Sequence, residues 1–465
     1  MTDTFKIVEK IRAAEEAFLD QRNSISADFA DDYPMIQRAV YNENFVAVGG
    51  SENRNGWRVR LRYIFQILRY ELFDRQRAKM TIHQTVFLTP STGRRFKGAT
   101  GWYDATVEAI ANDDVSGNSF CYEVPAFGTY RDRKARPSFY LGLPEVFYRG
   151  MSKFFVARRP VPNALLQDVA RFKTLVEAQG LTARTLEVGA FARAYRYLHD
   201  RSDVFETQLR KMQCKVVVTY PWYGQINMAM MLAANRLGLR TIDCQHGVQG
   251  PLHAAYSRWP AFCLDSLLFP QQFFVWTEGD KEWLDTWIGP NRVAEVTGIP
   301  WHNVSQEKIG ENAQQQAYER ALAAHDRNGV ILVSLQPNRP EFIVWLSEIL
   351  MQPEAKNYTW VVRNHPGNQN QLGALSELLD PFEMVLPVDV SSNAPLIGQL
   401  RSCDLHITDY SSVVTEASLV GMNSLMLTQR EDLYAQERRL GFAHSIVSGP
   451  AFWADVERLK APKQQ

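Results

Sequence analysis

Short apolar runs alternate with longer amphipathic segments along the C-terminal part of the chain. Apolar runs of this kind predict buried strands, and the amphipathic segments between them predict helices. The predicted strands are 330–335, 358–363, 382–386, 405–408 and 424–427, and the predicted helices are 341–351, 372–379, 396–400 and 412–420. Strands and helices that alternate in this way form a parallel sheet with helices on both faces.

A similar alternation begins at Lys215. The predicted strands are 215–220, 240–243, 273–277 and 293–297, and the helix 226–237 ends before Gly238, where a C-cap glycine belongs. Further upstream, a helix of mixed charge is expected as far as Asp31, and the run 85–88 predicts a strand. A chain of 465 residues is too long for one compact core, so two domains are expected.

Composition narrows the class of protein. Lys plus Arg and Asp plus Glu each number 51, a balance that argues against a nucleic-acid-binding protein. Five cysteines without a Cys-x-x-Cys pair predict neither a disulfide scaffold nor a zinc site, and they fit a reducing compartment. The charged N-terminus lacks the apolar core of a signal peptide, and no run approaches the roughly 20 apolar residues that cross a bilayer. We therefore expect a cytoplasmic protein that at most lies on the inner face of the membrane.

A first group of candidate site residues follows two of the C-terminal strands. Open α/β sheets bind ligands at the edge where the strands end. Arg363, Asn364 and His365 follow the strand 358–363 and precede Pro366, which holds His365 extended. An arginine beside a histidine suits a phosphate or diphosphate, and Gln336, after the strand 330–335, is assigned to the same site. The alternative is a structural histidine that satisfies a loop carbonyl.

A second group is Asp409, Ser411, Ser412 and Glu416, where a strand turns directly into a helix. The free N–H groups and the dipole of a helix N-terminus bind anions, and the two hydroxyls add donors. Glu416 lies one turn after Ser412, within reach of ribose hydroxyls. The alternative is a simple N-cap, but the acid stands at neither position that a capping box requires, which favours a binding function.

The third group is the segment from Gln245 to Pro251, after the strand 240–243. His246 could act as a general base on an acceptor hydroxyl or as a donor to a leaving phosphate. Gln245, Gly247 and Gln249 are assigned to the acceptor side of the same site. A lone histidine in a glycine loop is as often structural, so both interpretations stay open.

Several motifs are absent from the sequence. No Asp-x-Asp pair occurs, which removes the usual metal-bridged sugar-nucleotide site, and no P-loop, Gly-x-Gly-x-x-Gly or Gly-x-Ser-x-Gly motif is present. We therefore expect neither a metal nor a cofactor. Phosphate binding is then left to helix termini and basic side chains.

Four motifs in this order resemble a known family: Gln-His-Gly at 245–247, Thr-Gly-Ile-Pro at 297–300, Arg-x-His-Pro at 363–366, and Thr-Asp-Tyr-Ser-Ser at 408–412 with a following Glu. Together they are similar to GT-B glycosyltransferases of bacterial capsule and surface-polysaccharide biosynthesis. The resemblance covers roughly residues 216–427 and leaves the first 200 without a counterpart. It implies an α/β fold of two Rossmann-like, doubly wound domains facing across a cleft, with an irregular N-terminal elaboration.

The resemblance also implies which part of the chain forms each domain. Residues 1–300 would form the acceptor-side domain, 301–430 the donor-binding domain, and 431–465 a helical segment that packs back on the N-terminal domain. The donor nucleotide would contact these residues: Arg363, His365, Asp409, Ser411, Ser412, Glu416, Gly298 and Gln336. His246 and His365 would be catalytic.

The function that follows is metal-independent transfer of a sugar from a nucleotide-activated donor to a bacterial surface glycan or its lipid-linked precursor. Polyol-phosphate transferases that use CDP-glycerol or CDP-ribitol carry a similar pair of motifs, although Glu416 departs from their pattern. The same features also fit a non-hydrolysing sugar-nucleotide epimerase or a non-catalytic glycan-binding subunit.

Two segments bear on contact with a membrane. The segment 57–73 carries arginines near one face and leucine and isoleucine side chains on another, as an interfacial helix does, and an ordinary packed helix looks the same. The segment 131–159 holds eight basic residues and two acidic ones. It is either a solvated loop or a binding site for an anionic acceptor or lipid headgroup.

Overall fold

A computed structural model describes most of the chain. The described residues are 3–21, 25–47, 83–90, 94–98, 101–104, 106, 110, 119–124, 138–140, 159–251, 253–303, 312–325, 327–336, 339–365, 368, 371–428, 433–446 and 450–460. The segment 57–73, for which an interfacial and a packed helix were both considered, lies outside these residues, and so does the basic segment 131–159 apart from 138–140 and Arg159. No helix within the described ranges is long and apolar enough to cross a membrane.

The chain forms two compact units. Unit 1 comprises Met1–Arg95 and Thr100–Pro300, and unit 2 comprises Phe96–Ala99 and Trp301–Gln465. We predicted domains of 1–300 and 301–430, whereas unit 2 also includes Phe96–Ala99 and the residues after 430. Each unit is built around its own parallel sheet, which is the α/β class that the alternating pattern predicts.

Unit 1 contains a seven-stranded sheet whose described pairs are all parallel. Its strands are β1 (Thr85–Pro90), β4 (Ser119–Val124), β5 (Ser138–Tyr140), β6 (Val216–Thr219), β7 (Arg240–Cys244), β8 (Gln272–Val275) and β9 (Val293–Val296). They are arranged in the order β5-β4-β1-β6-β7-β8-β9. The chain therefore starts at β1, runs to one edge, and returns to build the other edge from β6, which is the doubly wound topology. Strands β2 (Arg94–Gly98) and β3 (Gly101–Asp104) form a separate two-stranded sheet.

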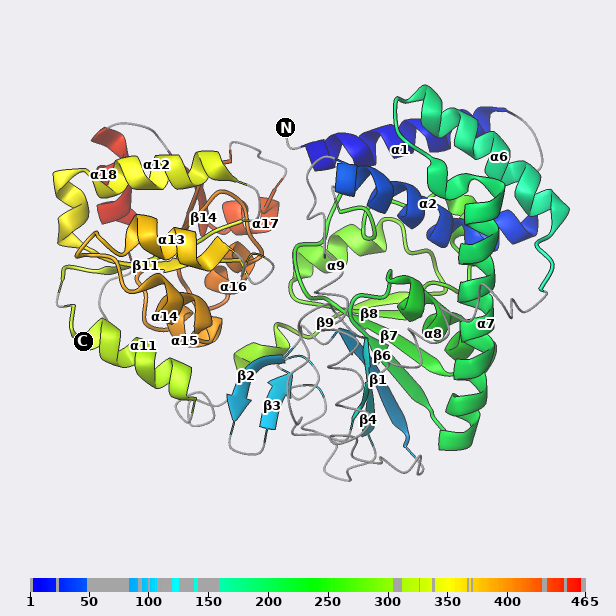
Figure 1. Ribbon diagram of the computed structural model, residues 1–465, viewed down its shortest axis with the longest axis horizontal. Coiled ribbons are helices and arrows are strands. Elements are labelled where there is room, and N and C mark those ends of the chain that lie inside the picture. Colours follow the sequence, from blue (N-terminus) through cyan, green and yellow to red (C-terminus); the bar gives the residue numbers. More distant parts are fainter. Residues whose placement is uncertain are drawn as a thin grey trace. The chain divides into compact units, whose positions relative to one another are not determined.

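The helices of unit 1 share one large core with one face of this sheet (Figure 1). They are α1 (Asp3–Asp20), α2 (Ala27–Ala47), α6 (Asn163–Ala178), α7 (Val188–Met212) and α8 (Gln225–Arg236), and α9 (Glu278–Asp285) connects β8 to β9. On the other face, Phe87, Val218 and Ile242 form a second, smaller cluster against which Ile110 packs. Because successive residues of each strand point to opposite faces, both clusters follow from the same apolar runs.

The opening of the chain differs from our prediction of one helix to Asp31. Two helices, α1 and α2, replace it, and the break falls before Ser26. The hydroxyl of Ser26 accepts the backbone N–H of Phe29 at 3.3 Å, and Asp168 of α6 accepts the N–H and O–H of Ser26 at 2.9 and 2.6 Å. A serine N-cap of this kind starts a new helix, and here α6 fixes its position.

Unit 2 contains a five-stranded parallel sheet in the order β11-β10-β12-β13-β14. Its strands are β10 (Val330–Ser334), β11 (Thr359–Arg363), β12 (Leu405–Thr408), β13 (Ser424–Met426) and β14 (Ala443–Ser445). The predicted strand 382–386 is wrong in extent, because only Val385 pairs, as an isolated bridge to Trp360 of β11. That bridge lies beyond β11, so unit 2 repeats the doubly wound order, with the direction of winding reversed between β10 and β12.

Helices cover both faces of the sheet in unit 2 (Figure 1). They are α11 (Ala313–Ala323), α12 (Pro340–Leu350), α13 (Leu372–Leu379), α14 (Val388–Asn393), α15 (Leu396–Leu400), α16 (Val413–Ser418), α17 (Ala435–Arg439) and α18 (Pro450–Leu459). Helices α12, α13 and α18 share a core with one face, and α11, α15 and α16 share a core with the other. The prediction of two Rossmann-like α/β domains is confirmed.

The C-terminal segment belongs to unit 2. We predicted a division at residue 430, with 431–465 as a separate helical segment, whereas the described residues of this segment are part of unit 2. Strand β14 pairs with β13, and Phe452 and Val456 of α18 lie in the core with Leu405 and Leu425. The hydrogen bond from the indole of Trp453 to Gln352, at 2.7 Å, ties α18 to the end of α12.

Candidate functional site

The predicted donor residues lie at the carboxyl edge of the sheet in unit 2. Ser334, the last residue of β10, is aligned with Arg363 of β11 and with Thr408 of β12. The segments that follow these three strands therefore begin at the same level, side by side. Since the winding reverses between β10 and β12, this edge is the topological switch point at which open α/β sheets bind ligands.

Side-chain hydrogen bonds join strands β10, β12 and β13 near this edge of the sheet. The imidazole of His406 lies in β12 between the hydroxyls of Ser334 and Ser424, at 2.7 and 2.9 Å. Burial lowers the pKa of His406 to about 3, so the ring stays neutral. The hydroxyl of Thr408 donates to the carbonyl of Ser334 at 2.8 Å. The ends of β10 and β12 are thereby locked together, which gives the residues after them fixed starting points.

An ion pair spans the switch point. Nε of Arg339, which follows β10 and precedes α12, lies 2.8 Å from Oδ2 of Asp409, which follows β12. The Asp409 side chain is 3% exposed and that of Arg339 is 27% exposed. Burial raises the pKa of Asp409, Arg339 lowers it, and Glu341 raises it. Arg339 was missed from the sequence, although it stands just beyond a strand end, as the residues that were selected do.

The serines after Asp409 lead into a helix that is shorter than predicted. Helix α16 is only six residues long, Val413–Ser418, with Ser412 at its N-cap and no side-chain hydrogen bond from that cap. Ser411 is buried, and its hydroxyl accepts the N–H of Val413 at 3.3 Å. A helix of this length has a small dipole, so any phosphate here depends more on the hydroxyls and on Arg339 than we expected.

Glu416 is buried on α16 and already has a partner. Its Oε2 accepts a hydrogen bond of 2.7 Å from the indole N–H of Trp301, the first residue of unit 2 after the domain boundary. Thr415, which precedes Glu416 in α16, donates its hydroxyl to the carboxylate of Glu437 in α17 at 2.5 Å. The indole and α17 therefore hold the acid-bearing helix from two sides. Trp301 is a second contributor that sequence reasoning missed, because it lies 115 residues from Glu416.

The structure gives Arg363 a supporting position. Its Nη1 donates to the carbonyl of Ala394 at 2.6 Å and to the side chain of Gln399 at 2.9 Å, so it ties β11 to α14 and α15. His365 is half-buried, and its carbonyl accepts the N–H of Asn368 at 2.9 Å. Gln336 is also half-buried, just after β10. Of the residues at this edge, His365, Gln336 and Ser412 keep partly accessible side chains.

The acceptor-side residues lie in unit 1, after β7. Gln245 is buried, and its side chain accepts the N–H of Trp276 at 2.6 Å and donates to the carbonyl of Gly247 at 3.0 Å. Its carbonyl accepts the indole N–H of Trp276 at 3.1 Å. Gln245 therefore joins the ends of β7 and β8 and shapes the loop that carries His246, rather than lining an open surface.

His246 is half-buried and lies against Tyr223, with 3.2 Å between its Nε2 and the hydroxyl. Close to this pair, the buried carboxyl of Asp243 accepts the hydroxyl of Tyr256 at 2.7 Å and the N–H of Trp222 at 3.0 Å. Burial raises the pKa of Asp243 to about 8. The loop after β7 and the loop after β6 are thus joined through one carboxyl group.

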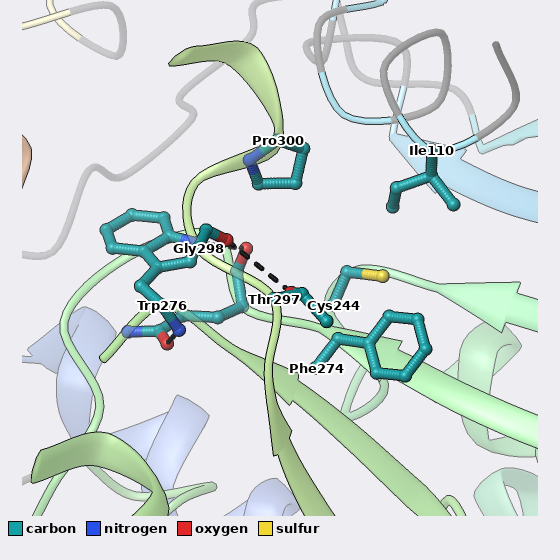
Figure 2. A pocket seen from close by; sticks show the side chains of 8 residues that line it. Ile110, Cys244, Phe274, Trp276, Thr297, Gly298 and Pro300 are labelled. Atoms are coloured by element: carbon teal, nitrogen blue, oxygen red, sulfur yellow. Dashed lines mark hydrogen bonds between the residues drawn. The ribbon is translucent and has the colours of Figure 1, made fainter. Parts of the chain in front are cut away.

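Gly298 and Gln245 also line a small pocket in unit 1, of roughly 160 Å³ including open space (Figure 2). Figure 2 shows Gly298 and Pro300 on one wall, with Ile110 across from them. Gly298 has φ +72°, a conformation that favours glycine. Pockets for drug-sized ligands measure about 300–1,000 Å³, so this hollow is too small for a whole sugar nucleotide. Gly298 was assigned to the donor, and the structure places it in unit 1.

Among the residues that the structure describes, no three His, Cys, Asp or Glu side chains are gathered closely enough to hold a metal ion. The five cysteines are buried and unbridged. Charged side chains at the edge of unit 2 include the Arg339–Asp409 pair, Arg363 and Glu416.

Comparisons with known proteins find resemblance only at the level of structure. No family model and no curated protein matches the chain. The UDP-GlcNAc 2-epimerase of Neisseria meningitidis is 15% identical, with a TM-score of 0.48 over 80% of this chain and 91% of that one. The epimerase of Methanocaldococcus jannaschii is 12% identical, with a TM-score of 0.47 over 82% and 94%. The wall teichoic acid polymerase TagF is 12% identical, with a TM-score of 0.42 over 87% and 89%.

Proposed function

We propose that this chain is a metal-independent glycosyltransferase of the GT-B type. It moves a sugar from a nucleotide-activated donor to a bacterial surface glycan or its lipid-linked precursor, working in the cytoplasm. The observation that carries the proposal is the edge of unit 2, where an arginine–aspartate pair, two serines and a buried glutamate follow adjacent strands at the switch point.

The residues at this edge match the parts of a nucleoside diphosphate. Arg339 is anchored through Nε by Asp409, which leaves its terminal nitrogens as donors for a phosphate. His365 and the hydroxyl of Ser412 supply further donors from the neighbouring segments. Trp301 holds Glu416 through Oε2, at 2.7 Å, and a carboxylate positioned in this way accepts ribose hydroxyls.

In the proposed reaction, charge develops on the phosphate as the bond between sugar and nucleotide breaks. Arg339 and His365 stabilise that charge with donors that are already positioned, so little reorganisation is needed. Asp409 acts as a positioning residue because it touches the arginine and not the phosphate. On the acceptor side, the imidazole of His246 accepts the proton of the attacking hydroxyl, and Tyr223 orients the ring through the 3.2 Å contact.

Turnover of the donor tests this proposal against its closest rival. A non-hydrolysing sugar-nucleotide epimerase would use the same phosphate and ribose contacts, but it converts its donor without an acceptor. The experiment incubates purified chain with each nucleotide sugar that stabilises it, with and without bacterial lipid-linked glycans, and separates the products. Transfer that requires an acceptor supports the glycosyltransferase; an epimerised donor in the absence of acceptor refutes it.

The two histidine variants assign the chemistry within the proposal. His246→Ala and His365→Ala are both expected to lower kcat by about 10²-fold or more, as loss of general-base or charge-stabilising groups does. His325, half-buried just after the end of α11, has its Nδ1 2.8 Å from the carbonyl of Ala321 and offers a matched His→Ala control. Turnover by the His246 and His365 variants that equals that of the His325 variant would remove both residues from the mechanism.

A further inference from the structure

One buried arginine of unit 1 has no counter-charge among the residues that the structure describes. Arg38 of α2 is 6% exposed, and its Cζ lies 4.8 Å from the ring centroid of Tyr41 and 4.4 Å from that of Tyr223. Its Nη2 donates to Asn42 at 3.1 Å. Among the described residues, none is a hydrogen-bond partner of Nε or Nη1, and no carboxylate forms an ion pair with the guanidinium.

Arg292 in the same unit shows how a structural arginine is satisfied. Its guanidinium also lies near an aromatic ring, with Cζ 5.1 Å from the centroid of Phe269. Its three nitrogens, however, all donate to backbone carbonyls, those of Pro270, Leu264 and Ser266. Aromatic contact alone therefore does not explain why two nitrogens of Arg38 remain unsatisfied. Burying a charge without a partner is strongly unfavourable, which points to an anion that completes the site.

Polar groups that are partly accessible surround this guanidinium. The hydroxyl of Tyr223 reaches Nε2 of His246, and the ring of His253 lies 5.4 Å from that of Tyr223. These three side chains are half-buried, whereas Arg38 is buried. Asp243, the nearby carboxyl group, is occupied by Tyr256 and by a backbone N–H. The cluster is therefore rich in donors and poor in negative charge.

The segments that supply the cluster come from the carboxyl edge of the sheet. Tyr223 follows β6 and His246 follows β7, two adjacent strands, and α2 lies over this region with Arg38. Burial, together with Arg38 and His246, lowers the pKa of His253 well below its usual value, so His253 adds a neutral ring rather than a second cation. Arg38 is then the group that supplies the positive charge.

We propose that Arg38, with Tyr223 and His246 beside it, binds a carboxylate or phosphate group of the second substrate. This inference rests on the proposed function, in which His246 serves the acceptor, and it adds a substrate class: the acceptor carries an acidic group next to the reacting hydroxyl. An acidic sugar and a phosphate-linked precursor share this chemistry.

Melting of the full-length chain tests the proposal with three probes: sodium phosphate, sodium glucuronate and neutral glucose, at one ionic strength set with sodium chloride. A ligand that binds only the folded state raises Tm. We expect phosphate or glucuronate, and not glucose, to raise the Tm of the native chain and of Arg292→Lys by more than it raises the Tm of Arg38→Met, which keeps only the phosphate contacts proposed in unit 2. Phosphate alone identifies a phosphorylated acceptor and glucuronate alone an acidic sugar. Equal shifts with glucose, or shifts unchanged in Arg38→Met, overturn the proposal.

The stability of Arg38→Met without ligand gives a second, independent result. Methionine keeps an apolar stem between the two tyrosines and removes the uncompensated charge, so its Tm in chloride buffer is expected to equal or exceed that of the native chain. Arg292→Met, which removes a structural arginine, is expected to have a lower Tm than the native chain. A similar loss of Tm in Arg38→Met overturns the proposal. Should Arg38→Met not fold, Arg38→Lys is expected to bind the anion about tenfold more weakly, and unchanged affinity overturns it.

The donor site provides the control that separates this inference from the proposed function. Nucleotide binding in unit 2 is expected to be the same in Arg38→Met and in the native chain. Loss of the anion response with intact nucleotide binding supports Arg38 as the anion site. Native chain that responds to anions and binds no nucleotide would refute the proposed function alone.

Discussion

The Arg339–Asp409 pair allows a prediction in which stability and pH are linked. Exposed ion pairs contribute less than about 1 kcal/mol, and breaking a fully buried pair costs about 3–5 kcal/mol. Asp409 is 3% exposed and Arg339 is 27% exposed, at a separation of 2.8 Å, so this pair falls between the two cases. We expect Arg339→Met to destabilise unit 2 by about 2 kcal/mol at pH 8, which for a domain of this size lowers Tm by roughly 4–8 °C.

The pH dependence identifies the cause of that loss. Burial raises the pKa of Asp409 in the folded chain and Arg339 lowers it, so removing Arg339 raises this pKa further. A carboxyl whose pKa is higher in the folded than in the unfolded state stabilises the fold below its unfolded pKa. That stability is lost as the pH rises through the folded pKa. The deficit of Arg339→Met is therefore expected to shrink as the pH falls from 8 toward 5, because Asp409 takes up a proton.

The assay is urea unfolding of the native chain, Arg339→Met, Asp409→Asn and the double variant at pH 5, 6.5 and 8. In the double variant no carboxylate is left unpaired, so it is expected to recover about 1 kcal/mol relative to the sum of the single changes. Its deficit is also expected to be independent of pH. Additive effects of the two substitutions, or a deficit of Arg339→Met that is the same at all three values, would refute the view that the pair is coupled through a buried charge.

Three further substitutions probe other contacts. Asp243→Asn is expected to make Tm less dependent on pH. The Asp243 carboxyl has a pKa of about 8, so the protonated carboxyl stabilises the native fold and this stability is lost as the pH rises through 8. A slope of Tm against pH that is unchanged between pH 6 and 9 would contradict this. Arg363→Met is expected to lower stability by about 2 kcal/mol through its bonds to α14 and Gln399, and to change nucleotide affinity by less than tenfold in calorimetry. Trp301→Phe removes the donor to Glu416 and is expected to cost about 1.5–3 kcal/mol in urea unfolding, whereas an unchanged midpoint would exclude a charge-assisted bond.

The sheets of both units follow closely from the sequence because their strands are short, β-branched or aromatic runs. The apolar runs at Val216–Thr219 and Leu405–Thr408 strongly favour strands, and both form central strands. The run 382–386 failed for a physical reason: it is followed by Pro387, and it lies at the edge of the sheet, where one backbone bridge to Trp360 is all that forms. Met384, Val385 and Leu386 are nevertheless buried, so the apolar run reports burial in the core and not pairing in the sheet.

The site was predictable only where its residues adjoin strand ends. Asp409 and Glu416 could be selected from their position after a buried run. Arg339 also lies beyond a strand end, but its pairing with Asp409, like the contact of Trp301 with Glu416, depends on how the strands and helices are ordered in space. Arg363 shows the reverse case, because a residue chosen for its charge turns out to support α14 and α15.

Calorimetric titration of nucleotides tests the central claim, that unit 2 binds a nucleotide-activated donor without metal. UDP, GDP, CDP and CMP, with their sugar conjugates, are titrated into the full chain in EDTA, and then into Glu416→Gln and Ser412→Ala. We predict that one nucleotide class binds the native chain in EDTA and that both substitutions weaken it by about tenfold or more, as loss of a hydrogen bond to a charged group does. Binding that needs added Mg²⁺, or an affinity that neither substitution changes, would contradict the account.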